Sequence, residues 1–166
     1  MAERWKPVSG YPNYEVSDSG RVKNINTGMM LSLGKDQTGY PRVCLSRNSK
    51  QKVHRVHRLV GKEFIGDHSM FDHINRDRTD NRTENIRGCT HASNNANAEI
   101  RRDNTTGYKG VSMSHKTKNK YIAYINKNRK RKYLGLFATA KEAAIAYNDM
   151  ASKLFGEFAN LNIITE

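Results

Sequence analysis

Short apolar alternations occupy both ends of this 166-residue chain, and a polar segment at 71–100 separates them. Within that segment, the stretch from Asn75 to Glu84 contains no apolar side chain. Such a stretch adds nothing to a hydrophobic core, because core formation requires apolar area to leave water. Hydrophobic residues make up only 36% of the sequence. The chain is therefore expected to form one domain of ordinary size or two to three small modules.

Charge is distributed unevenly along the chain. Residues 1–70 carry 12 basic and 6 acidic side chains, residues 71–100 carry 4 and 5, and residues 101–134 carry 11 and 1. The formal net charge of +13 points to a polyanion, most often nucleic acid. A hard ion such as Mg²⁺ would explain the acids in the middle, because it prefers carboxylate and amide oxygens. A polar loop with a solvated surface would explain them equally well.

Several classes of protein are excluded. No apolar run reaches the roughly 18 to 20 residues that cross a bilayer, so no membrane span is expected. The N-terminus, MAERWKPVSG, lacks the apolar core of a secretory signal, which favours a cytoplasmic protein. Cys44 and Cys89 cannot build a disulfide scaffold. Cys89 and His91 would supply only two zinc ligands, so no zinc site is expected.

The alternation predicts a mixed set of short elements. N-terminal strands are expected around 14–17, 21–22, 39–45 and 52–56, followed by a helix at 57–65 that ends at Gly66. The polar segment is expected to form strands at 71–74 and 85–87 and a helix at 91–97, after Thr90 as its N-cap. Three strands near 111, 121–125 and 133–137 follow, with the basic tract 127–132 as their last turn. A final helix is expected from Thr139 to Phe155, with Thr139 and Glu142 as a capping box.

Four residues of the polar segment have the composition of a centre that hydrolyses phosphodiesters, namely Asp72, His73, Asn85 and Asn94. Hydrolysis needs a base that works near neutral pH, and histidine has such a pKa. It also needs stabilisation of charge on the phosphate and on the departing oxygen, which one divalent metal supplies. Asp72 and His73 are adjacent, and a hairpin followed by a helix would bring Asn94 to the same phosphate. The residues alone favour catalysis only weakly, because Asp-His pairs also occur by chance.

The segment resembles the HNH nuclease motif, in the version of phage and intron-encoded homing endonucleases in which asparagine replaces the last histidine. The matching residues are 72–81, 84–87, 90, 93–95 and 97, with the helix 56–60 upstream. Residues 5–8, 10–11, 14–17 and 20–22 resemble the nuclease-associated modular domain of the same enzymes. Residues 107–162 resemble the APETALA2 DNA-binding domain, through 107–111, 133–137, 142–144, 146–148 and 159–161.

The resemblance implies a role for each residue of the centre. His73 would be the general base that activates water, and Asn85 would orient it by tying the loop through hydrogen bonds to the backbone. Asp72 and Asn94 would hold a single Mg²⁺ or Mn²⁺. The spacing from Asp72 and Asn85 favours Asn94 over His91 as the last position of the motif. The expected products carry 5′-phosphate and 3′-hydroxyl ends.

The basic residues between 101 and 134 are interleaved with tyrosines, which favours a sheet that faces the major groove of DNA over a merely solvated hairpin tip. The residues expected to contact DNA are Arg21, Lys23, Arg87, Lys109, Lys120, Tyr121, Arg129, Lys130, Arg131 and Lys132. Plant members of the APETALA2 family place arginines and a tryptophan where Ser112, Ser114 and Tyr121 stand here. The plant recognition sequence is therefore not expected to carry over.

These observations predict a small modular α+β protein. An N-terminal mixed β/α module is expected at 1–50, and an HNH nuclease module at 51–100 with its ββα-metal core at 71–98. A linker at 101–106 would lead to an APETALA2-like domain at 107–166, a three-stranded antiparallel sheet packed on one helix. The predicted function is metal-dependent cleavage of double-stranded DNA, with a monomer nicking one strand, in the cytoplasm (of the host cell if a phage encodes the chain). The alternative is a non-catalytic DNA-binding regulator derived from such a nuclease.

Overall fold

The computed structural model describes residues 2–164, which divide into two compact units between Thr90 and His91. Each unit combines antiparallel strands with helices, so the predicted α+β class is confirmed. None of the helices within residues 2–164 has both the length and the apolar character that a membrane span requires. The domain boundaries at 50 and at 101–106 remain predictions.

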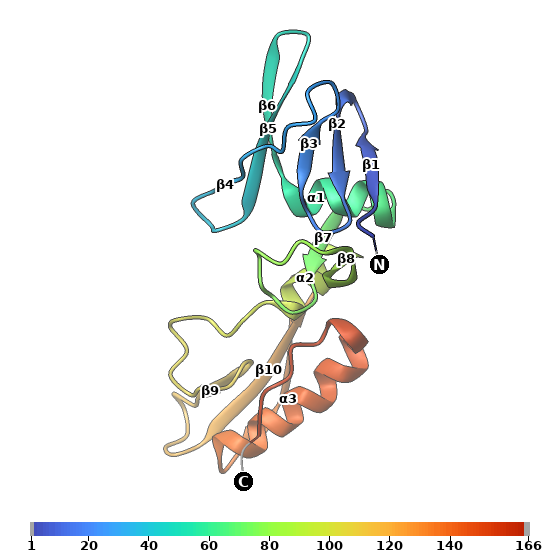
Figure 1. Ribbon diagram of the computed structural model, residues 1–166. Coiled ribbons are helices and arrows are strands. Elements are labelled where there is room, and N and C mark those ends of the chain that lie inside the picture. The colour runs from blue at the N-terminus through green and yellow to red at the C-terminus, as the bar shows by residue number, and fades with distance from the viewer. Residues whose placement is uncertain (1, 165–166) are drawn as a thin grey trace. The chain divides into compact units, whose positions relative to one another are not determined.

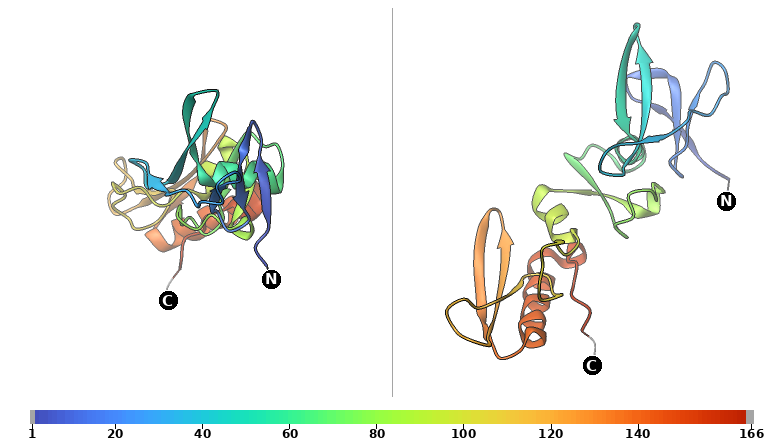
Figure 2. Two further views of the ribbon diagram at one scale, coloured as in Figure 1. Left: turned by 45° about the horizontal axis from the view of Figure 1, so that its top comes forward. Right: turned by 90° about the vertical axis from the view of Figure 1, so that its left-hand side faces the viewer.

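The first unit contains two three-stranded antiparallel sheets. The first sheet has the order β1-β2-β3, formed by Trp5–Val8, Tyr11–Ser17 and Val22–Asn24. The second has the order β4-β5-β6, formed by Gly34–Lys35, Pro41–Arg47 and Lys50–Arg55. Strands β5 and β6 form the long hairpin at the top of Figure 1, which the second view in Figure 2 shows from the side.

Helix α1 (Val56–Val60) follows β6 directly and continues as a π-helical turn at Gly61–Ile65. Gly66 follows with a φ of 129°, a conformation that glycine adopts without strain. The predicted helix and its end at Gly66 are thus confirmed.

A single hydrophobic core joins all parts of the first unit. Val16 comes from the first sheet, Leu45 from the second, Val60 from α1 and Ile86 from the strand that follows the polar loop. The N-terminal segment and the strands of the polar segment therefore form one body. The sequence pattern did not predict this shared core.

The polar segment forms a hairpin in which β7 (Met70–His73) pairs antiparallel with β8 (Ile86–Cys89). Asp72 lies opposite Arg87. The predicted strand at 71–74 is confirmed, whereas Asn85 does not lie in the second strand. It ends the 3₁₀ turn Thr83–Asn85, because its backbone N–H donates to the carbonyl of Arg82 within the turn.

The second unit begins with α2 (His91–Asn97) and contains the sheet β11-β10-β9. These strands are Val111–Met113 (β9), Tyr121–Lys127 (β10) and Lys130–Phe137 (β11). Helix α3 (Ala140–Phe155) runs alongside β10 in Figure 1, and the 3₁₀ turn Gly156–Phe158 follows it. The predicted three-stranded antiparallel sheet on one helix is confirmed, and so is the capping box of Thr139 and Glu142.

Apolar residues of the sheet and of α3 form the core of the second unit. Val111 and Ala123 pack with Ala143 and Ala144, and a second cluster lies around Tyr147. The pairing of β10 with β11 is irregular, because Ala123 lies opposite Gly135 whereas Tyr124 lies opposite Tyr133. Leu134 is therefore an extra residue, a β-bulge that changes which face the preceding side chains occupy.

Candidate active site

His73, the predicted general base, ends strand β7 and is only 4% exposed. Its Nε2 lies 3.1 Å from Oδ1 of the buried Asn81. The amide orientation of Asn81 follows from its Nδ2, which donates to the carbonyl of Thr79 at 3.1 Å. Because Oδ1 can only accept, His73 Nε2 carries the proton and the lone pair of the neutral ring lies on Nδ1.

Burial lowers the pKa of His73 below the ordinary value of a histidine. The hydrogen bond that His73 donates to Asn81 and the charges of Asp72, Asp77 and Asp80 oppose this shift, but the desolvation of the charged ring outweighs them. A lowered pKa means that His73 is neutral at neutral pH. It can therefore accept a proton, as a general base must.

Two aromatic rings also lie close to the ring of His73. The ring of His57, from α1, lies 4.9 Å from that of His73 in an edge-on arrangement, and the ring of Tyr40 lies 5.8 Å away. His57 is 3% exposed, and no hydrogen-bond partner for its Nδ1 lies within residues 2–164. Burial lowers the pKa of His57 to about 3, with a smaller effect from the charge of His73. His57 lies buried at the start of α1, and its contact with His73 was not predicted from the sequence.

Asn85 ties the two ends of the polar loop together. Its Oδ1 accepts from the backbone N–H of Asn75 at 2.9 Å, and its Nδ2 donates to the carbonyl of Asp80 at 2.8 Å. Its backbone carbonyl also accepts from the N–H of Ile74, the residue after His73. The chain directly after His73 is therefore fixed to Asn85.

The residues predicted to hold a metal lie in different units. Asp72 is buried in β7, where its carboxylate accepts from Nη2 of Arg87 at 3.3 Å. Asn94 lies on α2, in the second unit.

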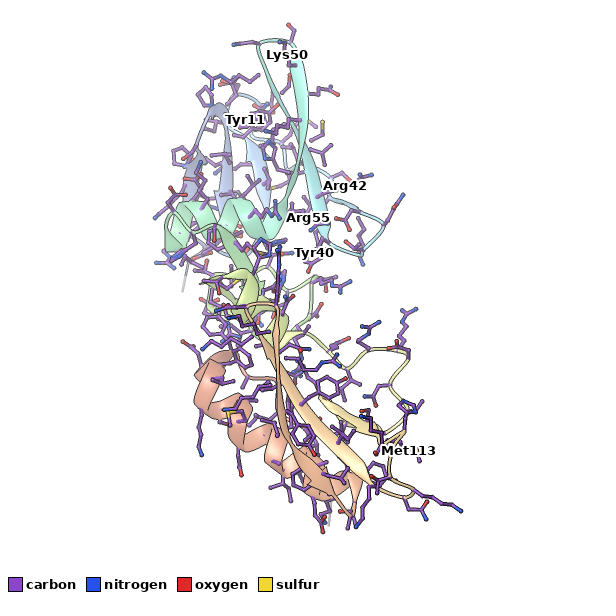
Figure 3. The ribbon with its side chains drawn as sticks, turned by 180° about the vertical axis from the view of Figure 1, so that it is seen from behind. Tyr11, Tyr40, Arg42, Lys50, Arg55 and Met113 are labelled. Carbon is purple, nitrogen blue, oxygen red and sulfur yellow. The ribbon has the colours of Figure 1, made fainter. Side chains whose placement is uncertain are left out.

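The first unit also carries a basic groove that was not predicted from the sequence. Its cavity of about 470 Å³ is lined by Asp36, Arg42, Lys52, Val53, His54, Arg55 and Arg58. Arg55 pairs with Asp36 at 2.6 Å and stacks over Tyr40 at 4.3 Å, whereas Arg42, Lys52 and Arg58 are exposed. Figure 3 shows Arg55 beside Tyr40 and Lys50 at the tip of the hairpin. Arg42 lies opposite Arg55 in the β5–β6 ladder, so no pattern along a single strand indicated that these residues share a site.

The predicted DNA contacts of the first unit are engaged in ion pairs. Arg21 pairs with Glu3, and Lys23 pairs with Glu15 at 2.9 Å. Both cations also lie over the ring of Trp5.

The predicted contacts of the second unit lie on both faces of its sheet. Tyr121 packs against the core on the helix side, and Lys132 reaches Sδ of Met150 in α3 at 3.8 Å. Arg131 instead stacks over the ring of Tyr124 at 4.3 Å. The remaining predicted DNA contacts differ in their exposure and in their hydrogen bonds. Lys109 donates to the carbonyls of Ala96 and Ala98, Lys120 is half-buried, and Arg129 and Lys130 are exposed at the β10–β11 turn.

Comparison with known proteins assigns these segments to families. The NUMOD4 motif matches residues 3–46, and the HNH endonuclease family matches residues 54–96, which include Asp72, His73, Asn85 and Asn94. The chain therefore contains an HNH endonuclease domain that is preceded by a NUMOD4 motif.

DNA endonuclease I-HmuI of Bacillus phage SP01 is a homologue, 33% identical over 94 residues that make up 54% of each protein. A solved structure described as "DNA binding and cleavage by the HNH homing endonuclease I-HmuI" matches with a TM-score of 0.50 and 34% identity over 52% of each chain. Dehydration-responsive element-binding protein 2E of Oryza sativa subsp. japonica is 45% identical over 58 residues, 34% of this chain and 18% of the plant protein. The chain thus spans about half the length of the phage nuclease.

HNH nucleases in general depend on a divalent metal ion. Within residues 2–164, no three His, Cys, Asp or Glu side chains form a group that could hold one. The donors predicted to hold the ion are the carboxylate of Asp72 in the first unit and the amide of Asn94 in the second. Oxygen donors of this kind fit a hard cation that completes its shell with water and phosphate.

Proposed function

We propose that this chain is a metal-dependent DNA endonuclease that hydrolyses a phosphodiester bond in duplex DNA. The observation that carries the proposal is the state of His73, a neutral imidazole whose Nε2–H donates to Asn81 and whose lone pair lies on Nδ1. The adjacent carboxylate of Asp72 supplies an oxygen donor on the same strand.

In the proposed mechanism, Nδ1 of His73 takes a proton from the attacking water. Asn81 holds the ring in the tautomer that makes this possible, and Asn85 fixes the loop that carries both residues. Asp72 and Asn94 would bind Mg²⁺ or Mn²⁺, which supplies Lewis-acid stabilisation of the phosphate and of the departing 3′-oxygen. Water attack at phosphorus leaves 5′-phosphate and 3′-hydroxyl ends.

Both units are proposed to bind the DNA. The basic groove offers Arg42, Lys52 and Arg58 to backbone phosphates, and the β10–β11 hairpin adds Arg129 and Arg131. The likeness of the second unit to a plant DNA-binding protein supports this role. With one proposed centre in each chain, a monomer would nick a single strand.

The test is cleavage of supercoiled DNA with Mg²⁺ or Mn²⁺. The substrates include DNA of the phage or host that carries the gene, and binding is measured in parallel. Wild type should convert supercoiled DNA to open circles, and both EDTA and His73→Ala should stop the conversion. His73→Ala should still bind DNA, and His115→Ala, at an exposed position, should still cut. Binding by wild type without cleavage in either metal would overturn the nuclease proposal in favour of a non-catalytic regulator.

A further inference from the structure

The sheet of the second unit presents an apolar face on the side away from α3. Ala123 and Ile125 of β10 are buried in the clusters that include α3, so the residues that alternate with them point the other way. Those residues and their partners across the ladder, which we call the outer face, are Ile122, Leu136, Tyr124 and Tyr133.

The outer face is open to solvent. Leu136 is 44% exposed and Tyr133 is 60% exposed, and none of the four residues belongs to a described core cluster. The free energy falls when a partner removes exposed apolar side chains from water. The outer face is therefore suited to a partner that offers apolar groups.

The charge around the outer face indicates which partner this is. The guanidinium of Arg131 lies 4.3 Å from the ring centroid of Tyr124, which places a cation on the same face. The segment 101–134 holds 11 basic residues and one acid. Duplex DNA complements this charge, and its major groove accepts a two-stranded ribbon or a small sheet.

The apolar group that a base edge presents in the major groove is the 5-methyl of thymine. On the outer face, Ser112 of β9 lies opposite Ile122, so this position offers no arginine to a guanine. We propose that the outer face reads thymine methyl groups through Ile122 and Leu136, while Arg131 contacts a neighbouring phosphate. This inference rests on the proposed DNA-binding function.

The test replaces thymine by uracil, which removes only the methyl group. Duplexes that the full-length His73→Ala protein binds are first selected from a random pool. Each thymine of the selected site is then changed to uracil, and binding is measured by titration. Affinity should fall about fourfold for each contacted methyl, as expected for one buried methyl group. Leu136→Ala should lose this sensitivity at one position or more.

Ile145→Ala is the matched control. Ile145 lies on α3 and is 44% exposed, as Leu136 is, so its variant should discriminate thymine from uracil as well as the parent does. If the selected DNA binds with equal affinity whether it contains thymine or uracil, the inference is overturned and the DNA-binding proposal is left intact. Absence of any DNA binding would overturn both. Self-association that Leu136→Ala abolishes would show that the outer face covers a second copy of the chain instead.

Discussion

Replacing Asn81 with alanine should slow cleavage without removing any residue predicted to touch the substrate. Asn81 is 5% exposed, and its Oδ1 is 3.1 Å from Nε2 of His73. Alanine leaves the buried Nε2–H without its acceptor. The ring then loses the hydrogen bond that keeps the proton on Nε2 and the lone pair on Nδ1.

The size of the effect follows from this one hydrogen bond. An unsatisfied buried donor costs roughly 1–3 kcal/mol, and each 1.4 kcal/mol corresponds to a factor of ten. The first-order rate of nicking at saturating DNA should therefore fall about 5- to 150-fold. Asn81→Asp keeps an acceptor near Nε2 but adds a charge that raises the pKa of His73. Its nicking rate should approach that of wild type at alkaline pH. As the pH is lowered, this rate should begin to fall at a higher pH than the wild-type rate does.

The assay is single-turnover nicking from pH 6 to pH 9, with the melting temperature of each variant measured in parallel. Asn26→Ala, at an exposed turn position, serves as the matched control and should change neither quantity. If Asn81→Ala melts at a lower temperature but nicks at the wild-type rate, Asn81 is only structural and the proposed role of the tautomer is wrong.

Three further predictions concern the first unit. Arg42→Ala should reduce the slope of log affinity against log salt by about 1, because one phosphate contact is lost. His57→Phe should flatten the dependence of stability on pH. In wild type, the buried neutral histidine stabilises fully above its unfolded pKa of about 6.5, and the free energy of unfolding falls by up to about 1.4 kcal/mol per pH unit from there toward its folded pKa of about 3. Gly61→Ala should destabilise this unit by roughly 1–3 kcal/mol, because a Cβ would lie 2.3 Å from Cδ1 of Phe71.

Each of these predictions has a control and a contrary outcome. Lys153→Ala on α3 should leave the slope of log affinity against log salt unchanged. If Arg42→Ala also leaves this slope unchanged, Arg42 in the basic groove does not contact DNA. Urea unfolding that is monitored by the fluorescence of Trp5, the sole tryptophan, reports on the first unit. An equal loss of stability toward acid pH in wild type and His57→Phe would contradict the burial argument. Gly28→Ala cannot serve as the control for Gly61→Ala, because Gly28 has a φ of 69° and a side chain there would strain the backbone. The control is Ala92→Gly in α2 of the second unit, which should leave the unfolding reported by Trp5 unchanged.

The sequence determined features that depend on neighbours along the chain. The polar loop between two short strands, the capping box at Thr139 and the alternation of the C-terminal strands all follow from local patterns, and the structure contains each of them. Residue type and spacing also selected Asp72, His73, Asn85 and Asn94, and all four lie within the residues that match the HNH endonuclease family.

Only the tertiary structure decided which residues surround His73 and which face each basic residue occupies. Asn81 and His57 reach His73 from a loop and a helix that the fold brings together, and no local pattern encodes such contacts. In β11, the extra residue Leu134 reverses the alternation, so Arg131 points to the outer face and Lys132 to α3. Side chains alternate with a period of two, and one inserted residue therefore exchanges the faces of every side chain on one side of it.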